Sequence, residues 1–454
     1  MYTTHAIDEM ESEVAELLIK RMFTKNHLNV PIETVNKLIR RYELSESKRL
    51  NCNFRLAEYQ AEAIRLAVSS QLMVLTGGPG TGKTCVIKGI VYVLRRLFKR
   101  PLMKLAAPTG KAARRMTESV GFPASTVQRL MGLTETGSYA KPIYGDFIIV
   151  DEVSMLDILT LDNLLRTLQD DIKLIFVGDI DQLPSVGSGA ILRDMIESFV
   201  IPCVMLDAPH RQKADSLLYS NICTVRKGHD FLTEGDDFRI IDADDTTGIE
   251  EAVDQYLHYV PIYGIDQTVI LTPCRKSGQV CANKINDLIQ KRINPYHEKP
   301  KDSIRTTVTD KEGNKRSFWL VKGDPVMQLI NREECSNGDV GKVINVNKTG
   351  VLVRFSDSMV FYKPNELNQL TLAYSMSIHK SQGSEYQCVI TPILKEHETV
   401  VTRNLIYTAL TRAKKICVLI QDKDTVKKGL KKEAASLRYT MLSEKIETAY
   451  RVRR

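Results

Sequence analysis

The chain has 454 residues, of which 43% are hydrophobic and 26% are charged. This length is too great for a single hydrophobic core and predicts about two to four domains, and the composition excludes a fibrous or disordered chain. The formal net charge of +8 favours a polyanionic partner such as nucleic acid, although the charge alone fits an ordinary soluble surface equally well.

The cysteine pattern and the lack of long apolar runs bear on the compartment. Nine cysteines are spread along the chain without a Cys-x-x-Cys pair or a Cys/His metal-binding spacing. We see neither a secretory leader nor an apolar run of about eighteen residues. We therefore expect reduced thiols in a cytoplasmic protein that does not span a membrane.

Residues 1–50 predict a helical N-terminal region. Apolar side chains recur at helical spacing over residues 6–21 and again after Pro31, which predicts two amphipathic helices. The polar residues 43–53 then predict a linker to the next domain.

Residues 51–215 alternate helical patterns with short apolar strands and predict a first α/β domain of the doubly wound kind. Strands that are apolar along their whole length are typical of a parallel sheet with both faces buried. The polar run at residues 133–145 interrupts this alternation, and a small protruding hairpin and a plain surface loop explain it equally well. The expected strands lie at residues 72–75, 103–106, 147–150, 174–177 and 203–206.

A second α/β domain is predicted from residues 216–296 and 371–454, with one of its strands at residues 269–272. Residues 297–370 change character, because short strands there alternate with Gly, Asn and Asp turns. This pattern predicts a small inserted β-barrel. The basic end of the chain, residues 423–454, is either a solvated helix end or a phosphate contact.

A glycine-rich segment, GGPGTGKT at residues 77–84, lies between the first apolar strand and a predicted helix. It predicts a P-loop, because glycine lets backbone N–H groups approach phosphate oxygens and the helix N-terminus attracts the same anion. Lys83 is expected to contact the β- and γ-phosphates and Thr84 to ligate Mg²⁺, while the side chain of Cys85 is expected to face the core. The residues expected to bind the nucleotide here are Gly78, Pro79, Gly80, Thr81, Gly82, Lys83, Thr84 and Cys85.

Polar side chains follow two other predicted strands. Asp151 and Glu152 come directly after the strand at residues 147–150, so that Asp151 is placed to hold Mg²⁺ and Glu152 to polarise an attacking water. Gln182 lies in the loop VGDIDQLPSVGSG after the next strand and is placed to contact a γ-phosphate or that water. Alone, these residues fit an ordinary solvated loop; together with a P-loop in the same domain, they predict phosphoryl transfer.

The order of the motifs resembles that of superfamily 1 helicases, and their residues are similar to those of the RecD/TraA-like subgroup that moves 5′ to 3′. The resemblance covers residues 56–415. It implies two RecA-like domains, a Src-homology-like barrel at residues 297–370, and the use of ATP with Mg²⁺. The motifs that carry it are LAEYQAEAI, GGPGTGKT, APTGKAARRM, ASTVQRLMG, IIVDEVSM, VGDIDQLPSVGSG, HRQ, SIHKSQGSEY and LIYTALTRAKK.

The resemblance also implies roles for single residues. Gln60 would read adenine through its amide, and Glu385 would approach the ribose. Arg211 and Arg412 would clamp the γ-phosphate from two domains. Seven residues would line the strand channel, namely Thr109, Lys111, Thr126, Gln128, Ser377, His379 and Lys380.

The activity implied is that of an ATP-dependent DNA helicase that translocates 5′ to 3′ on single-stranded DNA by closing a cleft between its domains. Such a protein is expected to act as a monomer on single-stranded and fork DNA, with replication or recombination proteins as further partners.

The sequence departs from the family in three places. Gln128 stands where the family usually has His, Ser377 stands where it often has Thr, and residues 133–145 are fewer than in many of the family's strand-separating pins. Two alternatives therefore stay open. One is an ATPase subunit that remodels or loads nucleoprotein without processive unwinding, and the other is a relative that acts on RNA.

Overall fold

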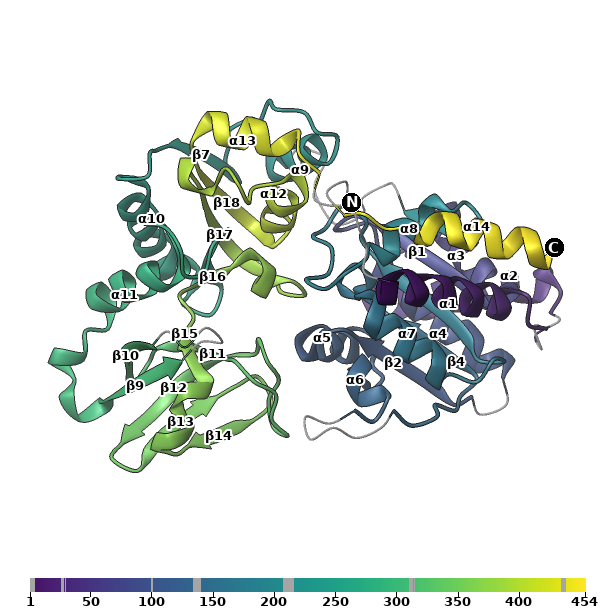
Figure 1. The fold of residues 1–454 in the computed structure, drawn as a ribbon, viewed down its shortest axis with the longest axis horizontal. Coiled ribbons are helices and arrows are strands. Elements are labelled where there is room, and N and C mark those ends of the chain that lie inside the picture. Colours follow the sequence, from purple (N-terminus) through teal and green to yellow (C-terminus); the bar gives the residue numbers. More distant parts are fainter. Residues whose placement is uncertain are drawn as a thin grey trace. The chain divides into compact units, whose positions relative to one another are not determined.

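The computed structural model describes residues 5–25, 28, 30–98, 101–133, 140–206, 216–309, 313, 315–433 and 438–454. The chain divides into two compact units, each containing one parallel sheet with its helices (Figure 1). Unit 1 comprises Met1–Pro108, Ala112–Lys213 and Ala435–Arg454, and unit 2 comprises Thr109–Lys111 and Ala214–Ala434. The predicted α/β class with two parallel-sheet domains is confirmed.

The sheet of unit 1 has six strands in the order β3-β2-β4-β5-β1-β6, and every neighbouring pair is parallel. The five predicted strands are all present. Strand β3 was not predicted, because it consists of three small or polar residues and carries no apolar signal. The strands are β1 (Leu72–Gly77), β2 (Met103–Ala107), β3 (Ala124–Thr126), β4 (Phe147–Val150), β5 (Lys173–Gly178) and β6 (Cys203–Leu206).

The central strands β1, β4 and β5 are buried at every position, which explains why they are almost entirely apolar. Alternate residues of each strand enter two different cores, as Leu72 and Val74 do on one face and Met73 and Leu75 on the other. Helices complete the two outer layers. They are α3 (Glu58–Ser69), α4 (Lys83–Leu97), α5 (Gly110–Val120), α6 (Val127–Leu130), α7 (Ile158–Thr167) and α8 (Ile191–Glu197), with a short 3₁₀ turn η1 (Val153–Met155).

The two predicted N-terminal helices are present as α1 (His5–Met22) and α2 (Ile32–Leu50), and both belong to unit 1. Helix α1 packs on α7, whereas α2 packs on α3 and α4. The linker predicted at residues 43–53 is wrong, since α2 continues to Leu50. Its polar residues are held by the fold: the buried Glu43 accepts a hydrogen bond from the N–H of Leu56 at 2.9 Å.

The last helix, α14 (Leu442–Arg453), corrects the predicted boundary of the second domain, because it lies in unit 1 rather than unit 2. It runs beside α1 (Figure 1), and its side chains Leu442 and Ile446 are fully buried in the core that also contains Leu18. Periodicity predicts a helix here but does not say which sheet it covers.

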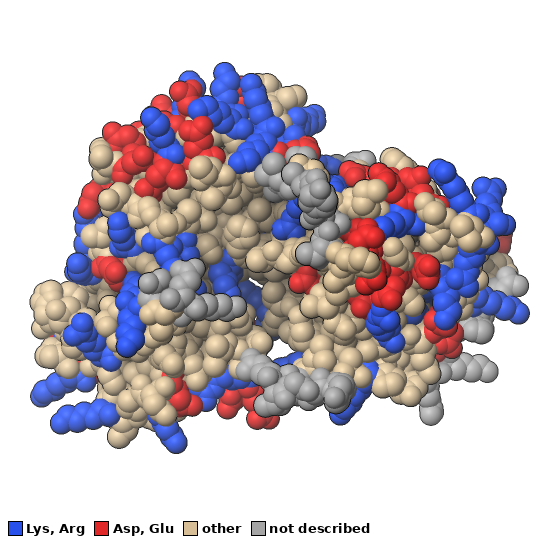
Figure 2. All heavy atoms as spheres, viewed as in Figure 1, with Lys and Arg blue, Asp and Glu red and all other residues tan. Residues whose placement is uncertain are grey.

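The basic end of the chain, residues 423–454, consequently does not form one continuous surface. Part of it forms α13 (Lys423–Leu430) in unit 2 and part forms α14 in unit 1. Several of its cations are paired, for example Lys428 with Glu398 at 2.7 Å. On the face drawn in Figure 2, Lys and Arg side chains are interspersed with Asp and Glu over both units.

The sheet of unit 2 has five parallel strands in the order β16-β8-β17-β18-β7. These are β7 (Phe238–Asp242), β8 (Thr268–Thr272), β16 (Ser375–Ser377), β17 (Tyr386–Ile393) and β18 (Ala413–Gln421). The helices of this unit, besides α13, are α9 (Leu217–Arg226), α10 (Gly248–Tyr263), α11 (Ala282–Ile293) and α12 (Arg403–Leu410). Short 3₁₀ turns are η2 (Tyr296–Glu298), η3 (Pro300–Asp302), η4 (Pro364–Gln369), η5 (Ile378–Ser381) and η6 (Lys395–His397).

The β-rich insertion is present between α11 and β16 as two antiparallel sheets. Strands β9 (Ser303–Thr309) and β10 (Lys315–Val321) form one, and the other has the order β14-β13-β12-β11-β15. The described pairings do not close these sheets into a barrel, so the barrel stays a prediction. The strands of the larger sheet are β11 (Pro325–Gln328), β12 (Val340–Asn347), β13 (Gly350–Arg354), β14 (Met359–Tyr362) and β15 (Leu370–Leu372).

The insertion shares its core with the parallel sheet of unit 2. Val343 and Tyr362 of the insertion pack in one cluster with Ile270 and Val418 of the sheet. Among the described residues, no helix combines the length and the apolar character needed to cross a bilayer.

The buried Lys173 predicts how stability depends on pH. Its ammonium donates to the carbonyl oxygens of Val68, at 3.1 Å, and Ser70, and burial lowers its pKa to about 7. Above pH 7 the unfolded chain therefore binds more protons than the folded one at this site. The free energy of unfolding should rise with pH by up to about 1.4 kcal/mol per unit.

Replacing Lys173 by Met should flatten that rise between pH 7 and pH 9, which denaturant unfolding at each pH would measure. The exposed Lys37→Met variant is the control and should keep the dependence of the wild type. An equal slope in Lys173→Met and the wild type would contradict the assignment.

Candidate functional site

The glycine-rich loop after β1 adopts a backbone that requires glycine at two positions. A Cβ at Gly77 would lie 2.8 Å from the Thr81 hydroxyl and 2.9 Å from the carbonyl oxygen of Leu206. Gly82 has a φ of +90°, and a Cβ there would collide with the side-chain nitrogen of Gln60. The loop therefore forms a close-fitting backbone cradle at the start of α4, as a phosphate site needs.

Lys83, the first residue of α4, lies over this loop. Its ammonium donates to the carbonyl oxygens of Gly77 and Gly78, the latter at 3.0 Å. The Thr81 hydroxyl donates to the same Gly78 carbonyl at 2.9 Å. The cation is thus held at the mouth of the cradle, where an anion could replace the two carbonyls as its partner.

Gln60 borders the loop from α3. Its side-chain nitrogen donates to the Thr81 carbonyl at 3.0 Å, and its oxygen accepts from the N–H of Ala57 at 3.1 Å. The side chain is buried, so its amide orientation is fixed by these two bonds. Each amide atom retains a second hydrogen-bonding position, and the adenine contact stays a prediction.

The side chain of Cys85 faces away from the loop, in line with its expected orientation. The Tyr42 hydroxyl of α2 donates to the Cys85 carbonyl at 2.9 Å and lies 3.6 Å from its sulfur. Burial raises the pKa of the thiol. Only the backbone N–H of Cys85, in the first turn of α4, is available for the predicted nucleotide contact.

Asp151 and Glu152 follow β4 in a constrained turn. Glu152 has a φ of +54° and a ψ of +40°, a left-handed conformation that is unusual for a residue other than glycine. Its N–H donates to the Asp151 carboxylate at 2.8 Å. Burial, and next the charge of Glu152, raise the pKa of Asp151 to about 6, while Lys83 acts in the opposite direction.

These carboxylates fit a divalent cation. Burial disfavours the anionic form of Asp151, and a bound cation would stabilise that form. Among the described residues no three metal-ligating side chains lie together. The adjacent carboxylates of Asp151 and Glu152 suit Mg²⁺, which often takes only one or two protein oxygens and completes its shell with phosphates and water.

Gln182 is held by a residue that the sequence did not single out. Its side-chain nitrogen donates to the Asp179 carboxylate at 3.2 Å, and the other oxygen of that carboxylate accepts from the N–H of Asp181 at 3.1 Å. Both Asp179 and Gln182 are buried. The sequence signals for Asp179 were its place directly after β5, where the chain leaves the sheet, and its position in the same motif as Gln182.

One edge of the unit 1 sheet collects these groups. The P-loop, Gln182 and Asp151 follow β1, β5 and β4, which are adjacent strands, and parallel strands end at the same edge. The predicted strand-contact residues follow the next two strands. Thr109 and Lys111 come after β2, and Thr126 and Gln128 come after β3.

The two residues after β3 differ in their surroundings. Thr126 caps α6, since its hydroxyl oxygen accepts from the N–H of Arg129 at 3.2 Å. Gln128 is exposed on the same short helix. Thr126 therefore has a structural role that sequence reasoning did not foresee, and its hydroxyl hydrogen is still available as a donor.

In unit 2, the predicted nucleotide contacts are occupied by neighbouring groups. The buried Arg412 donates to the carbonyl oxygens of Thr408, at 3.0 Å, and Ser384, at 3.1 Å, and to the Thr411 hydroxyl. Glu385 forms an ion pair with Lys414 at 2.8 Å. Neither a γ-phosphate nor a ribose contact follows from these bonds, and both roles stay predictions.

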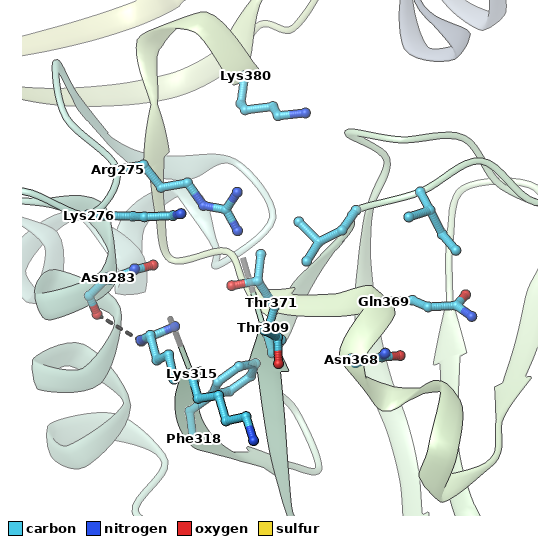
Figure 3. A pocket seen from close by; sticks show the side chains of 14 residues that line it. Arg275, Lys276, Asn283, Thr309, Lys315, Phe318, Asn368, Gln369, Thr371 and Lys380 are labelled. Carbon is cyan, nitrogen blue, oxygen red and sulfur yellow. Dashed lines mark hydrogen bonds between the residues drawn. The ribbon is translucent and has the colours of Figure 1, made fainter. Parts of the chain in front are cut away.

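Ser377, His379 and Lys380 lie together at the carboxyl end of β16 and in η5. Lys380 also lines a cavity of about 800 Å³ within unit 2 (Figure 3). Its ammonium donates to the Asn337 side chain at 2.8 Å, and burial lowers its pKa, with a smaller effect from Arg275.

This cavity is strongly basic. In Figure 3, Arg275 and Lys276 project into it from the end of β8, and Lys315 projects from β10. None of the fourteen residues that line it is acidic. Of these cations only Lys380 was predicted from the sequence; the adjacent Arg275 and Lys276, shortly after an apolar strand, carried a signal that could have found them.

Two predicted features lie outside the described residues. They are Arg211 and the centre of the predicted hairpin, residues 134–139.

Comparison with known proteins agrees with this arrangement. Residues 60–188 match the AAA domain family, and residues 372–420 match the UvrD-like helicase C-terminal domain. The chain is 32% identical to the ATP-dependent RecD2 DNA helicase of Deinococcus radiodurans, over 79% of this chain and 48% of that protein. It is 26% identical to the RecBCD enzyme subunit RecD of Haemophilus influenzae, over 82% of this chain and 70% of that one.

The chain is thus similar to RecD-type proteins over most of its length. It spans about half the length of the Deinococcus protein. Among solved structures, it resembles a Pif1 helicase studied in unwinding of forked duplex DNA, with a TM-score of 0.53 and 17% identity over 88% of this chain and 98% of that one. The Pif1 helicase of Candida albicans gives a TM-score of 0.50 and 20% identity over 82% of this chain and 96% of that one. These structures confirm the fold.

Gly82 offers a test of the loop. Gly82→Ala should lower the affinity for ATP by at least about tenfold, because the new Cβ strains the backbone and displaces Gln60. Titration with a fluorescent ATP analogue would measure this. Gly121→Ala is the matched control, since its φ is +79° but nothing lies within 4 Å of a Cβ there. Wild-type affinity in Gly82→Ala would contradict the loop assignment.

Proposed function

We propose that the chain is an ATP-dependent DNA helicase that translocates 5′ to 3′ on single-stranded DNA. The observation that carries the proposal is the shared edge of the unit 1 sheet. There a phosphate cradle, two carboxylates and a buried glutamine follow β1, β4 and β5, next to the strand-contact candidates that follow β2 and β3. The name of the Deinococcus relative, an ATP-dependent DNA helicase, supports the same reading.

In this proposal the nucleotide is held by unit 1. Backbone N–H groups of Gly78 and of residues 80–85 and the ammonium of Lys83 bind the phosphates, and Gln60 contacts adenine. Mg²⁺ would be held by the Thr84 hydroxyl and the Asp151 carboxylate and would neutralise charge on the phosphates.

The hydrolytic step is assigned to four side chains, of which Glu152, Gln182 and Arg211 belong to unit 1 and Arg412 to unit 2. Glu152 accepts a proton from the attacking water, and its left-handed backbone sets the direction of its carboxylate. Gln182, oriented by Asp179, contacts the γ-phosphate or that water. Arg211 and Arg412 supply positive charge to the transition state; Arg412 must first give up some of its present carbonyl partners.

Single-stranded DNA is assigned to the candidates Thr109, Lys111, Thr126 and Gln128 and to Ser377, His379 and Lys380. We extend this second group into the basic cavity of unit 2, where Arg275, Lys276 and Lys315 join Lys380. Closely spaced cations suit a phosphodiester backbone, whereas they do not read a base sequence.

We further propose a cytoplasmic monomer that acts on single-stranded and fork DNA with replication or recombination proteins. The Haemophilus relative, which is a subunit of a larger enzyme, supports such partners. An ATPase that remodels nucleoprotein without unwinding, and a relative that acts on RNA, are the outcomes to be separated by experiment.

Strand displacement on tailed duplexes tests the proposal directly. The wild type should separate a duplex with a 5′ tail and leave 3′-tailed and blunt duplexes intact. Lys83→Ala should lose at least about 100-fold in DNA-stimulated ATPase, because the cation that contacts the phosphates is gone. Unwinding from a 3′ tail alone would refute the polarity. ATPase without unwinding would favour the remodelling alternative, and stronger stimulation by RNA than by DNA the RNA-directed one.

The basic cavity gives a separate prediction. Lys315→Gln should reduce the slope of log affinity against log salt for an oligothymidylate by about 0.7, the value for one phosphate contact on a single strand. Fluorescence titration would measure it, and the sole tryptophan, Trp319, lies on the same strand β10 as a reporter. Lys348→Gln, in an exposed turn away from the cavity, is the control and should keep the wild-type slope. An unchanged slope in Lys315→Gln excludes this lysine from the strand path.

A further inference from the structure

The loop that carries Gln182 accepts several hydrogen bonds from Arg438, a residue near the C-terminal end of the chain. One terminal nitrogen of Arg438 donates hydrogen bonds to the carbonyl oxygens of Gly187, at 2.6 Å, and Gly189, at 2.7 Å, and to the Ser185 hydroxyl at 3.2 Å. Its other terminal nitrogen donates to the Ser185 carbonyl. All four acceptors are neutral oxygens of residues 185–189.

This arrangement explains how the loop keeps its path. Three of its carbonyl oxygens converge on one point, where their partial negative charges would repel each other without a cation between them. A guanidinium supplies several N–H donors in a fixed plane. Its positive charge attracts all of these oxygens, because each of them is neutral and carries only a partial negative charge. Arg438 therefore acts as the centre around which residues 185–189 fold.

The other side of the loop is held by the start of α7. The Ile158 N–H donates to the Ser188 carbonyl at 3.0 Å. Gly187 lies so close to Asp157 that a Cβ on the glycine would be 2.7 Å from the Cβ of the aspartate. Asp157 is itself fixed as the N-cap of α7, accepting from the N–H of Thr160 at 2.8 Å.

The segment that supplies Arg438 is firmly anchored in unit 1. The Thr440 hydroxyl lies 2.8 Å from the Glu11 carboxylate and 2.9 Å from that of Asp194, and the N–H of Met441 donates to Glu11 at 3.1 Å. Next along the chain, the buried Leu442 joins the core beneath α1. A guanidinium on this anchor holds the loop in place rather than moving with it.

We propose that Arg438 is a positioning residue for ATP hydrolysis: by fixing residues 185–189, it fixes Gln182 three residues earlier in the same loop. The inference rests on the proposed function, in which Gln182 contacts the γ-phosphate or the attacking water. Asp179, at the end of β5, holds the Gln182 side chain by a hydrogen bond, and Arg438 holds the following residues of the loop. The C-terminal segment is then part of the hydrolytic unit, although it follows all the helicase motifs in the sequence.

Steady-state ATPase of the full chain with saturating oligothymidylate tests the proposal. Arg438→Gln should lower kcat on the order of 10- to 100-fold and leave KM within about twofold, because the misplaced glutamine affects the reaction more than nucleotide binding. Arg438→Lys, which keeps the charge but not the planar donors, should be intermediate. Arg451→Gln is the matched control: this exposed arginine of α14 pairs with Glu447 at 3.2 Å and should keep the wild-type kcat.

Hydrogen exchange without nucleotide gives a readout independent of hydrolysis. Backbone amides of residues 183–189 should exchange faster in Arg438→Gln than in the wild type and Arg451→Gln, while those of β1 and α4 stay unchanged. A wild-type kcat in Arg438→Gln, or an equal loss in Arg451→Gln, would overturn the inference. A wild type without ATPase would overturn the proposed function instead, and the exchange of the loop would still decide whether Arg438 holds it.

Discussion

Parallel pairing of β1 with β5, and of β5 with β4, is the constraint on which the rest of unit 1 depends. Parallel strands end at the same edge, so the loops that follow them are brought together whatever their separation in the sequence. The phosphate cradle, the carboxylates and the buried glutamine meet for this reason. The pairing is possible because both faces of the sheet are covered, which in turn requires strands without polar residues in their middle.

The same edge places the predicted nucleotide contacts beside predicted strand contacts. Moving from β1 through β5 and β4 to β2 and β3, the loops change from nucleotide candidates to strand candidates. Glu152 lies near the middle of this row of loops. Its backbone is left-handed, a strained conformation for a residue other than glycine that persists only because the surrounding fold imposes it.

Much of this could be predicted from the sequence, because local signals carried it. Apolar runs located the strands, and the P-loop with its flanking strand and helix located the cradle. What failed depended on distant packing. Helix α14 was assigned to the wrong domain because periodicity does not reveal which sheet a helix covers, and the bonds of Arg438 join it to a loop about 250 residues earlier, a pairing that no motif connects. Arg412 matches its motif, yet its guanidinium donates to the nearby Thr408 carbonyl and to the Ser384 carbonyl, which the fold brings close from 28 residues away.

The central claim is that nucleotide and strand are bound along one edge and influence each other. The most direct test is the affinity of the full chain for an oligothymidylate, measured by fluorescence anisotropy with a non-hydrolysable ATP analogue and again with ADP. The account predicts affinities that differ by at least about fivefold, and by thermodynamic reciprocity the strand must change the nucleotide affinity by the same factor. Equal strand affinity in the two nucleotide states would contradict it.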